Sequence, residues 1–461
     1  MSSPKVIFTT DRPTSRQIEA CAPFGLHLRA GAAPLADWRE PAAHVRTALL
    51  AGQIALLTGP SGCGKSRTLH ALTEHLRRRS RVVIVSHSES PRTDPLLIDI
   101  LGHDLPPERV MAHLARFGLA EPALLARRLG ELSEGQRHRA LLAAGFWRAE
   151  RVGADWLLID EFCSVLDRVT AEGVAHTFAR AARATRVRVV VATAHHDLAR
   201  RLAPDLHLQF DALGSWRPCG PTSPAPDPII IEPGSKRDLE RLIDHHYLAG
   251  PPATRVGYLR AVDELHDQLA GVLVISMPTL NGVWRAQAWP GRYSACSRRA
   301  ASARLNAEVR CISRVIVDPR YRGRGVARRL VDKYLRDPQT PATEAVAAMG
   351  SICPLFERAG MTGYRLPRHP ADARLADALE SEGHEAWMLA DADRAADLLR
   401  RPLLARELER WSRCRHLQNA QPDERARLAG ARLCVTPMAY AHVFPPSTAS
   451  NRRKGEPDEV R

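Results

Sequence analysis

The chain has 461 residues, and 44% of them are hydrophobic, which is enough for two or three domains with a core each. Its apolar runs fall short of the roughly eighteen residues that a membrane helix needs, and Met1 to Lys5 lacks the layout of a signal peptide. We therefore expect a cytoplasmic protein without membrane insertion. The nine cysteines stand singly with no Cys-x-x-Cys pair, which argues against a disulfide framework or a structural metal.

The formal net charge of +15 comes almost wholly from arginine. Such a balance suggests a nucleic acid, a phosphate-rich cofactor or another anionic partner. A biased genome with solvated arginine-rich surfaces explains the same composition equally well. Charge alone therefore leaves nucleic acid as one open candidate for a partner.

The first half of the chain has the pattern of an α/β domain. Residues 1–44 form a lead-in with several prolines and no clear period, and residues 45–213 alternate strand-like apolar runs with helical stretches. That alternation predicts a mainly parallel sheet. The expected strands are Gln53–Thr58, Arg81–Val85, Trp156–Ile159 and Val187–Ala192.

A proline-rich stretch at 214–228 separates this domain from the rest, because it cannot continue a helix or a central strand. A second α/β segment follows over 229–366, and an arginine- and alanine-rich helical extension over 367–444. Residues 445–461 are polar and expected to be disordered. The predicted fold class is thus α/β, with two domains and a C-terminal helical extension.

A glycine-rich turn follows the first strand and precedes a helix that begins near Arg67. Its glycines let successive N–H groups point inward at phosphates, and the helix N-terminus adds partial positive charge. Lys65 would neutralise β- and γ-phosphate oxygens, and the Ser66 hydroxyl would ligate Mg²⁺. The predicted ATP-binding residues are Gly59, Pro60, Ser61, Gly62, Cys63, Gly64, Lys65, Ser66 and Arg67.

Two acids end the strand Trp156–Ile159. Buried parallel strands deliver the residues at their carboxyl ends to the ligand crevice, so both acids are expected beside the phosphates. Asp160 would be the second Mg²⁺ ligand, and Glu161 would act in catalysis by orienting the attacking water. The competing explanation is that the two acids cap the next helix.

The run Leu132 to Gln136, which precedes the acidic strand, resembles the signature peptide of the ABC ATPase superfamily. In that family Ser133, Gly135 and Gln136 would face the γ-phosphate of an ATP held by a partner domain. The resemblance, which covers Leu49 to Leu202, therefore implies ATP hydrolysis by a head-to-tail homodimer that encloses two ATP molecules. Pairing with a different ABC chain is the alternative.

Two further segments match the same family, and one departs from it. Ser164 to Asp167 corresponds to the D-loop, and His196 corresponds to the catalytic switch histidine, although the adjacent His195 leaves that choice open. No glutamine follows the strand Arg81–Val85, where the family places one. The residues that could stand in for it are Ser86 and His87.

In the second half, Val309 to Val317 reads as a strand closed by Pro319, with a glycine- and arginine-rich turn and a helix through Tyr334 behind it. The run Arg320-x-x-Gly323-x-Gly325 resembles the acyl-CoA loop of the GNAT acyltransferase superfamily. The resemblance implies an acetyl-CoA or other acyl-CoA cofactor, gripped by loop amides and arginines. The corresponding residues are Val315, Val317, Arg320, Arg322, Gly323, Arg324, Gly325, Val326 and Ala327.

Later segments extend this resemblance, and one position departs from it. Thr343–Met349 is the expected following strand, and Cys353–Met361 resembles the next helix of the family. Many members carry a tyrosine where this chain has Phe356, which has no proton for the departing thiolate. The proton would then come from water, Ser313, Cys353 or Tyr364.

Three residues are candidates for the base that takes the proton from the attacking amine. Each of them is also explained as an ordinary surface or packing residue, and direct attack by a bound amine is the default, because proximity dominates such catalysis. The candidates are Glu308, Glu344 and His246.

Together these patterns predict an ABC ATPase coupled to acyl transfer from acyl-CoA to an amine of a macromolecule, with nucleic acid as the favoured substrate. Two alternatives stay open at this point. The second domain could sense acyl-CoA without turnover, as Phe356 allows, or the chain could be the ATPase subunit of a transporter.

Overall fold

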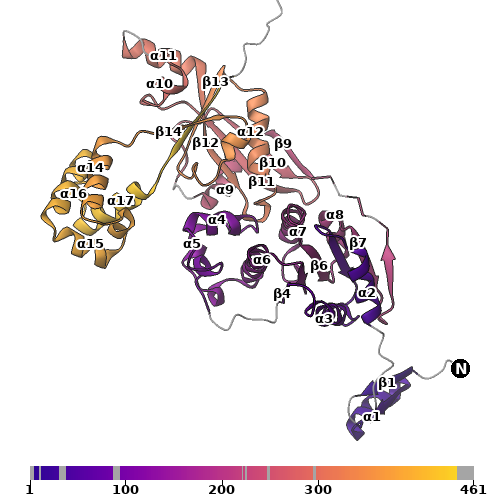
Figure 1. Cartoon of the computed structure of the whole chain (residues 1–461). Coiled ribbons are helices and arrows are strands. Elements are labelled where there is room, and N and C mark those ends of the chain that lie inside the picture. The colour runs from indigo at the N-terminus through magenta and orange to yellow at the C-terminus, as the bar shows by residue number, and fades with distance from the viewer. Residues whose placement is uncertain are drawn as a thin grey trace, which may run out of the picture. The chain divides into compact units, whose positions relative to one another are not determined.

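The computed structural model describes residues 5–9, 12–30, 38–86, 94–220, 222–223, 226–246, 250–293 and 297–443. The chain divides into two compact units, Met1–Asp227 and Pro228–Arg461, and Figure 1 colours it from one end to the other. The division falls at the end of the proline-rich stretch 214–228. No helix in the described ranges is both long and apolar enough to cross a membrane.

The first unit is built on a six-stranded sheet with the order β4-β5-β6-β3-β7-β8. All pairings are parallel except that of β7 with the edge strand β8. The inner strands are runs of Val, Ile and Leu, which fits a parallel sheet buried on both faces. The strands are β3 (Ile54–Thr58), β4 (Val82–Val85), β5 (Trp156–Ile159), β6 (Arg188–Thr193), β7 (Leu206–Phe210) and β8 (Trp216–Cys219).

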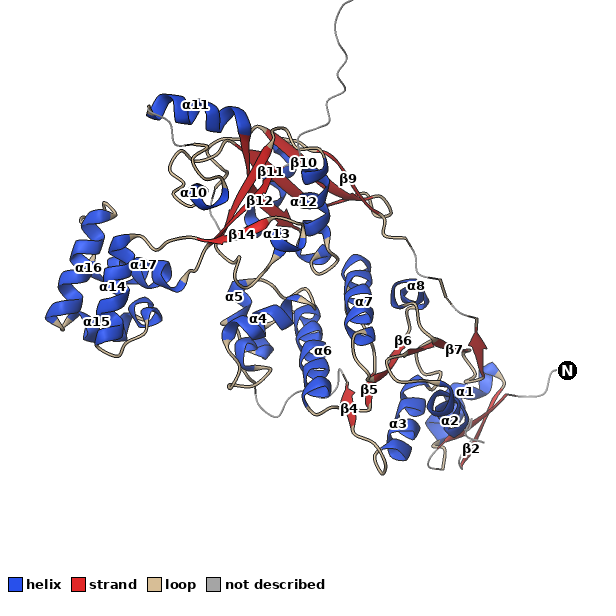
Figure 2. Cartoon of the chain, turned by 45° about the horizontal axis from the view of Figure 1, so that its top comes forward, coloured by secondary structure: helices blue, strands red, loops and turns tan. Residues whose placement is uncertain are grey.

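Helices cover both faces of this sheet, as Figure 2 shows. One apolar cluster packs α2 and α3 against the sheet, and a larger one joins α4, α6 and α7 to it. The expected α/β domain is thereby confirmed. The helices are α2 (Arg39–Ala48), α3 (Lys65–Leu76), α4 (Pro107–Ala115), α5 (Pro122–Leu125), α6 (Glu134–Arg151), α7 (Arg168–Arg183) and α8 (Ala199–Leu202), with 3-10 turns at η2 (Leu97–Asp99), η3 (Leu129–Glu131) and η4 (His196–Leu198).

Two stretches expected to be irregular contain regular elements. Within 1–44, β1 (Lys5–Thr9) and β2 (Leu26–Ala30) pair in parallel, with α1 (Ser15–Cys21) and η1 (Ala22–Phe24) between them. Within 214–228, β8 forms in spite of Pro218. An edge strand tolerates proline because one of its backbone sides has no ladder to complete.

The second unit contains a seven-stranded sheet with the order β14-β15-β13-β12-β11-β10-β9. Its pairings are antiparallel except that of β12 with β13, so it is a mixed sheet. The strands are β9 (Ile229–Pro233), β10 (Gly257–Asp263), β11 (Gln268–Ser276), β12 (Val309–Val317), β13 (Ala342–Ala347), β14 (Thr362–Arg365) and β15 (Met438–Val443).

Helices pack on both faces of this sheet. Gly271 of β11 approaches Val326 and Leu330 of α12, whereas Val272 and Val274 pack with α9 on the opposite face. The helices around the sheet are α9 (Lys236–Leu242), α10 (Arg285–Ala288), α11 (Arg298–Glu308), α12 (Val326–Arg336) and α13 (Leu355–Arg358), with η5 (Ile243–His245) and η6 (Pro319–Tyr321).

The helical region proves to be an insertion and not an extension that ends the chain. Its helices lie between β14 and β15, and β15 returns to pair with both β13 and β14. The range 367–444 was therefore wrong at its end, because Met438–Val443 is a strand, with its middle residues Ala439 to Ala441 buried. Residues 445–461 lie outside the described residues. The inserted elements are α14 (Pro370–Ser381), η7 (Ala386–Ala390), α15 (Ala392–Leu399), α16 (Pro402–Cys414) and α17 (Pro422–Cys434).

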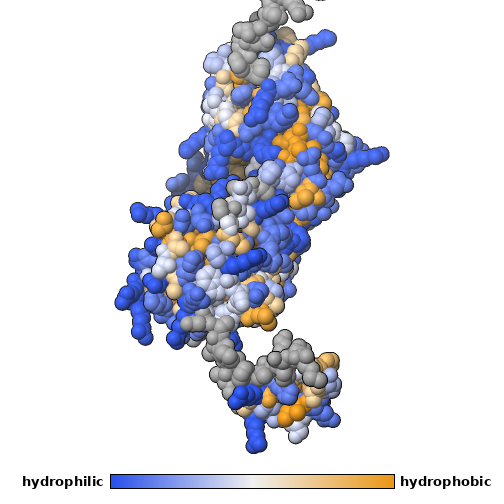
Figure 3. Space-filling view, turned by 90° about the vertical axis from the view of Figure 1, so that its right-hand side faces the viewer, coloured by the Kyte–Doolittle hydropathy of each residue, from blue (hydrophilic) through white to orange (hydrophobic). Residues whose placement is uncertain are grey.

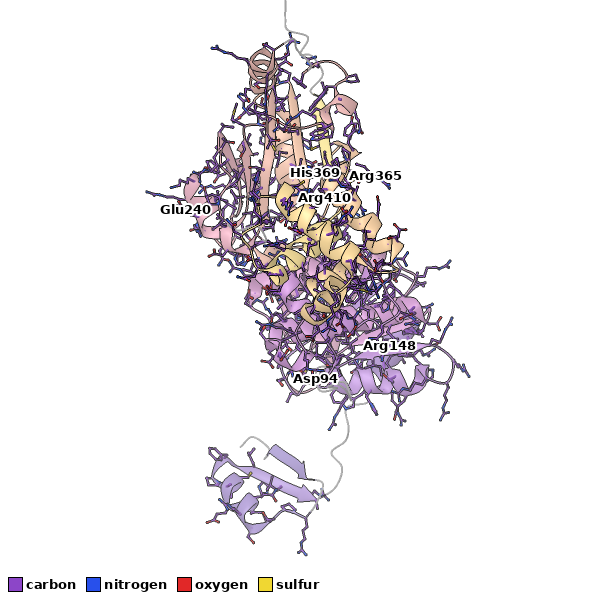
Figure 4. All side chains as sticks on the ribbon, turned by 90° about the vertical axis from the view of Figure 1, so that its left-hand side faces the viewer. Asp94, Arg148, Glu240, Arg365, His369 and Arg410 are labelled. Carbon is purple, nitrogen blue, oxygen red and sulfur yellow. The ribbon has the colours of Figure 1, made fainter. Side chains whose placement is uncertain are left out.

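The inserted helices have their own apolar core and a buried polar centre. Asp372 accepts from Trp411 Nε1 (2.8 Å) and from Arg415, and so ties α14 to α16. Elsewhere in the insertion arginines pair with nearby acids, as Arg410, labelled in Figure 4, does with Glu407 (2.8 Å).

Figure 3 draws the molecule from the right-hand side of Figure 1. The face seen there is mainly hydrophilic with scattered apolar patches.

Candidate functional site

The phosphate loop leaves the fully buried strand β3 and opens α3, as the sequence predicted. Gly62 and Gly64 take left-handed backbone conformations, with φ of 79° and 101°. Glycine adopts these angles readily, whereas other residues are strained there. Gly64 is the N-cap of α3, so the free N–H groups of the first helical turn face the loop.

Lys65 lies inside the curl of this loop. Its ammonium donates to the carbonyl oxygens of Gly59 (2.7 Å) and Pro60 (2.8 Å). The charge is thus held among the loop amides, where an anion would bind. Ser61, Ser66 and Arg67 are exposed around it, and Cys63 is buried beneath it.

An aromatic residue that the sequence analysis missed lies against the loop. A Cβ atom added to Gly64 would come within 1.9 Å of the Trp38 ring, and one added to Gly214 within 2.8 Å. The ring therefore contacts the glycine backbone directly, beside the start of α3. A flat aromatic face in this place suits stacking with a base. The only sequence signal was a lone tryptophan in the lead-in.

The two acids follow β5, which is separated from β3 only by β6. Because all three strands are parallel, their carboxyl ends meet at one edge of the sheet. Asp160 is half-buried and accepts the Glu161 N–H (3.0 Å). Glu161 is exposed and has a left-handed backbone with φ of 53°. Such strain in a non-glycine residue concentrates at functional sites.

The signature residues form the start of α6. Ser133 Oγ accepts the Gln136 N–H (3.3 Å), and Gln136 Oε1 accepts the Ser133 N–H (3.1 Å), which makes a capping box. Gly135 lies under the D-loop, because a Cβ there would meet Leu166 at 3.0 Å. The structure thus gives Ser133 and Gln136 a capping role in addition to any contact with nucleotide.

A buried hydrogen bond joins α6 to the segment behind the acids. His138 Nε2 accepts the Cys163 N–H at 3.0 Å, and both residues are buried. Cys163 has a left-handed backbone, with φ of 58°. Asp167 then caps α7 by accepting the Thr170 N–H (3.0 Å). The signature helix and the D-loop are therefore linked directly, a contact that no local pattern predicted.

The two adjacent histidines after β6 have different surroundings. His195 is half-buried against the Ser164 backbone, and burial and then Arg168 lower its pKa. His196 is exposed, and its neighbour Asp197 pairs with Arg168. Both histidines stand at the same sheet edge as the acids, and the choice between them stays a prediction. Of the two residues that could stand in for the missing glutamine, Ser86 directly follows β4, and His87 lies outside the described residues.

The second candidate site lies where β12 diverges from β13. β12 pairs with β11 over most of its length but with β13 only from Val309 to Ile312. A register shift at Ser313 marks the point of divergence, and Ser313 Oγ bonds Ser276 Oγ (2.6 Å). The backbone of Val315 and Val317 on that side therefore has no strand partner in the described part of the chain. An extended ligand could pair there as an added strand does.

The glycine- and arginine-rich turn closes this strand. Gly323 and Gly325 have φ of 81° and 82°, and Gly325 is the N-cap of α12 without a side-chain cap. Val326 and Ala327 open the helix, so their amides face the turn. Arg320 pairs with Asp318 (2.7 Å), and Arg322 Nε donates to the Val317 carbonyl (3.3 Å).

Arg324 departs from the expected role. It is buried, its guanidinium lies over the Tyr321 ring at 5.1 Å, and it forms an ion pair with Asp263 at 3.8 Å. Asp263 also accepts from His266 Nδ1 (3.0 Å). Burial alone would raise the pKa of Asp263, but His266, Tyr321 and Arg324 together lower it. Arg324 thus supports the turn from within, and Arg320 and Arg322 are the arginines left near its outer side.

Most of the acid and base candidates are engaged elsewhere. Glu344 is buried and accepts two bonds from Arg285, both of 2.7 Å, and Glu308 accepts from Arg292 (2.8 Å). Neither is a free base in this arrangement. His246 follows η5 and is half-buried.

The residues that could protonate the departing thiolate differ in their surroundings. Ser313 is bonded to Ser276, Tyr364 packs against Trp284, and Cys353 is exposed. Phe356 is buried and its ring lies 5.1 Å from that of Tyr440, which the sequence analysis did not single out. Burial raises the pKa of Tyr440 to about 12, so its hydroxyl stays protonated.

Comparison with known proteins finds relatives of both units. The family model "Acetyltransferase (GNAT) family" matches residues 235–348. The lipoprotein-releasing system ATP-binding protein LolD of Paramagnetospirillum magneticum is 32% identical over 185 residues, covering 33% of this chain and 79% of that protein. LolD 2 of Rhodopseudomonas palustris is 30% identical over 198 residues, covering 36% and 82%. A dimeric bacterial ABC transporter cassette is 19% identical with a TM-score of 0.30, covering 37% of this chain and 87% of that chain.

Proposed function

The first half of the chain belongs to the ABC ATPase family and the second half carries a GNAT acetyltransferase domain, and we propose that ATP turnover in the first controls acyl transfer in the second. The acceptor is an amine on a nucleic acid, and the acyl donor is acetyl-CoA or another acyl-CoA. The observation that carries this proposal is the divergence of β12 from β13 directly before a glycine turn that opens a helix.

The phosphate loop fits ATP with Mg²⁺. Its inward amides and the Lys65 ammonium would form a cradle for phosphate oxygens, and Ser66 and Asp160 would supply the oxygen ligands that Mg²⁺ prefers. Bound Mg²⁺ would neutralise charge on the phosphates. Lys65 would exchange its bonds with Gly59 and Pro60 for phosphate oxygens, and Glu161 would orient the attacking water.

Two copies of the chain would act together. The signature residues Ser133 and Gly135 stand at the N-terminus of α6, which is a second anion-binding end. In a head-to-tail homodimer each α6 would complete the ATP site of the other copy. The bond from Cys163 to His138 would then transmit closure of the dimer to Glu161, because it ties α6 to the segment behind the acids.

The acyltransferase site fits a pantetheine thioester. The backbone edge at Val315 and Val317, which pairs with no described strand, would pair with the pantetheine amides, and Arg322 would release the Val317 carbonyl. The amides at Gly325 to Ala327 would hold the pyrophosphate. The chain would bring the amine to the thioester and orient it, since the candidate acids and bases are mostly engaged in other bonds.

The experiment that tests this proposal measures thiol release from acetyl-CoA by the full chain with DNA, with and without ATP. We expect release that depends on both DNA and ATP and that is abolished in Gly325→Glu, whose carboxylate would repel the pyrophosphate. Binding of acetyl-CoA with no release under any of these conditions would contradict acyl transfer.

A second candidate function is favoured by Phe356 and by the buried ion pair of Glu344 with Arg285. With no tyrosine at position 356 and no free carboxylate at 344, the domain would bind acyl-CoA as a sensor of its concentration. In that case acetyl-CoA would change the rate of ATP hydrolysis without being consumed. The same experiment separates the two functions, because only the transferase releases thiol.

A further inference from the structure

The connection between β11 and β12 is much longer than their geometry requires. The two strands are antiparallel neighbours with Ser276 opposite Cys311, and about two to five residues join such pairs in most proteins. Here residues 277–308 intervene and contain α10 and α11. We call this segment the arm. Figures 1 and 2 show α11 extending past the end of the sheet.

The base of the arm is fixed to the sheet. Arg285 of α10 is 4% exposed and donates two bonds of 2.7 Å to Glu344 of β13, which is 2% exposed. Trp284 and Trp289 pack on each other and join one apolar cluster with β12, β13 and β15. Because a buried bidentate pair and large aromatic rings hold it, the base of the arm is a positioned element of the domain.

The outer side of the arm is strongly basic. The arm as a whole, residues 277–308, contains five arginines and one acid, Glu308. Glu344 and Glu308 neutralise Arg285 and Arg292, and the remaining three arginines form no ion pair with any described carboxylate. These three are exposed on α11, whose sole buried residue is Leu305. They are Arg298, Arg299 and Arg304.

This concentration of charge is not a general property of the second unit. The helical insertion, residues 366–437, has twelve arginines but also twelve acids, so its net charge is zero. Many of those arginines are paired, as Arg401 is with Glu382 (2.8 Å). The arm therefore differs from the arginine-rich helices in having positive charge without nearby compensation.

Two exposed apolar side chains lie in the same segment. Leu280 is 54% exposed and Val283 is 80% exposed, both just before α10. Apolar wedges beside arginines are used to enter between bases and unstack them. A base amine inside a duplex must leave the stack before chemistry can reach it. The combination favours a nucleic-acid duplex over a free anion, which would need no wedge.

The arm also lies at the amino end of β12, which is the end away from the glycine turn. The glycine turn follows the carboxyl end of this strand, and the arm enters its amino end at Val309. The free edge of β12 runs from Ser313 to Val317. A cofactor whose pyrophosphate is at the turn and whose pantetheine follows this edge would direct its thioester toward the arm.

From these observations we infer that the arm is the acceptor-binding element of the transferase. Arg298, Arg299 and Arg304 contact duplex phosphates, and Leu280 and Val283 enter the base stack. This inference rests on the proposed function, since it names the surface that brings the acceptor amine to the acyl-CoA site.

The test measures binding of the full chain to a fluorescein-labelled DNA duplex of about 25 base pairs by fluorescence anisotropy over a range of salt concentrations. In the triple variant Arg298→Ala/Arg299→Ala/Arg304→Ala, affinity at physiological salt should fall by about tenfold to a hundredfold. Its log–log salt slope should become shallower by about 2.7, or 0.9 for each lost phosphate contact.

A matched control removes three exposed arginines from the neutral insertion: Arg374→Ala, Arg406→Ala and Arg427→Ala. Its affinity for the duplex should stay within about twofold of the wild type. Equal losses in the two triple variants, no loss in the arm variant, or no duplex binding by the wild-type chain would each overturn the inference.

Entry of the apolar wedge, Leu280 and Val283, into the base stack can be measured separately from duplex affinity. A duplex that contains 2-aminopurine becomes brighter when a base leaves the stack. Leu280→Ser/Val283→Ser should lose that signal and retain at least half of the salt slope, since its arginines are intact. An unchanged 2-aminopurine signal would contradict the wedge assignment.

The thiol-release assay with acetyl-CoA separates failure of this inference from failure of the proposed function. If the arm variant loses duplex affinity but wild-type protein never releases thiol, acyl transfer is wrong and the binding surface stands. If thiol release is normal and the arm variant binds duplex like the wild type, the arm inference alone is wrong.

Discussion

At the phosphate loop Gly64 caps α3 with φ of 101°, and at the loop after β12 Gly325 caps α12 with φ of 82°. Both turns expose helix amides in the same way, but their surroundings differ. A Cβ at Gly64 would overlap the Trp38 ring at 1.9 Å, whereas a Cβ at Gly325 would meet nothing within 4 Å.

The second turn is held from below instead. Tyr321 and Arg324 extend inward from it to Asp263, which His266 also contacts. Two turns with the same backbone geometry are therefore fixed by different means. One is held by close packing against its own backbone, and the other by buried charges under its side chains.

Arg285→Ala should destabilise the second unit by about 3–5 kcal/mol, because it leaves the Glu344 carboxylate buried without its partner. Denaturant unfolding of the full chain, followed by the tryptophan signal, measures the change. The control is Arg292→Ala, whose pair with Glu308 is exposed and should contribute less than about 1 kcal/mol. Similar losses in the two variants would show that burial of the pair is unimportant.

Gly64→Ala should weaken ATP binding about thirtyfold to several thousandfold. Left-handed strain contributes about 1–2 kcal/mol, and overlap with Trp38 contributes about 1–3 kcal/mol more. Gly62→Ala is the control, since its φ of 79° brings the same strain but its Cβ meets nothing within 4 Å. Titration with a fluorescent ATP analogue should show a loss of about tenfold in the control. Equal losses would mean that Trp38 does not constrain the loop.

Asp263→Asn should destabilise the second unit by about 1–3 kcal/mol at neutral pH, because it removes the charge that His266 and Arg324 face. The folded pKa of Asp263 is lowered, so its contribution to stability is fully present above the unfolded value of about 3.9. It disappears as pH falls through the folded pKa.

Urea unfolding at several pH values checks this sign. The difference between wild type and Asp263→Asn should be constant above about pH 5 and should shrink below about pH 4. The neighbouring exposed Glu264→Gln serves as control and should change the unfolding free energy by less than about 0.5 kcal/mol. A difference that grows as pH falls would contradict the assignment.

Ser133→Ala should cost about 1 kcal/mol of stability through loss of the α6 cap. Ser133→Asp keeps the cap, and should leave stability within about 0.5 kcal/mol of the wild type. Its charge would nevertheless face a partner's γ-phosphate, so ATP turnover should fall. If Ser133→Asp hydrolyses ATP at the wild-type rate, Ser133 is a helix cap only.

The sequence was sufficient for the features that local patterns encode. The apolar runs predicted β3, β4, β5 and β6 to within a residue or two, and the motifs located both helix starts. These features depend on neighbours in the chain, since a glycine turn between strand and helix is a local arrangement.

The features that were missed depend on contacts between distant residues. Arg285 and Glu344 are 59 positions apart, so their pairing could not be seen in either local run. Arg324 was expected to contact the cofactor like its neighbours, but the fold turns it toward Asp263. β15 was missed because it is a short strand that follows a long series of helices, and its partners in β13 lie far back in the chain: Ala342 and Val443 pair although they are 101 positions apart.

The central claim is that one chain holds ATP at the first glycine turn and acyl-CoA at the second. Isothermal titration of wild-type protein, Gly64→Ala and Gly325→Glu with Mg²⁺-ATP and with acetyl-CoA tests it most directly. We predict that wild-type protein binds both ligands, that Gly64→Ala loses only ATP and that Gly325→Glu loses only acetyl-CoA. Failure of the wild-type chain to bind either ligand, or loss of both ligands in one folded variant, would contradict the account.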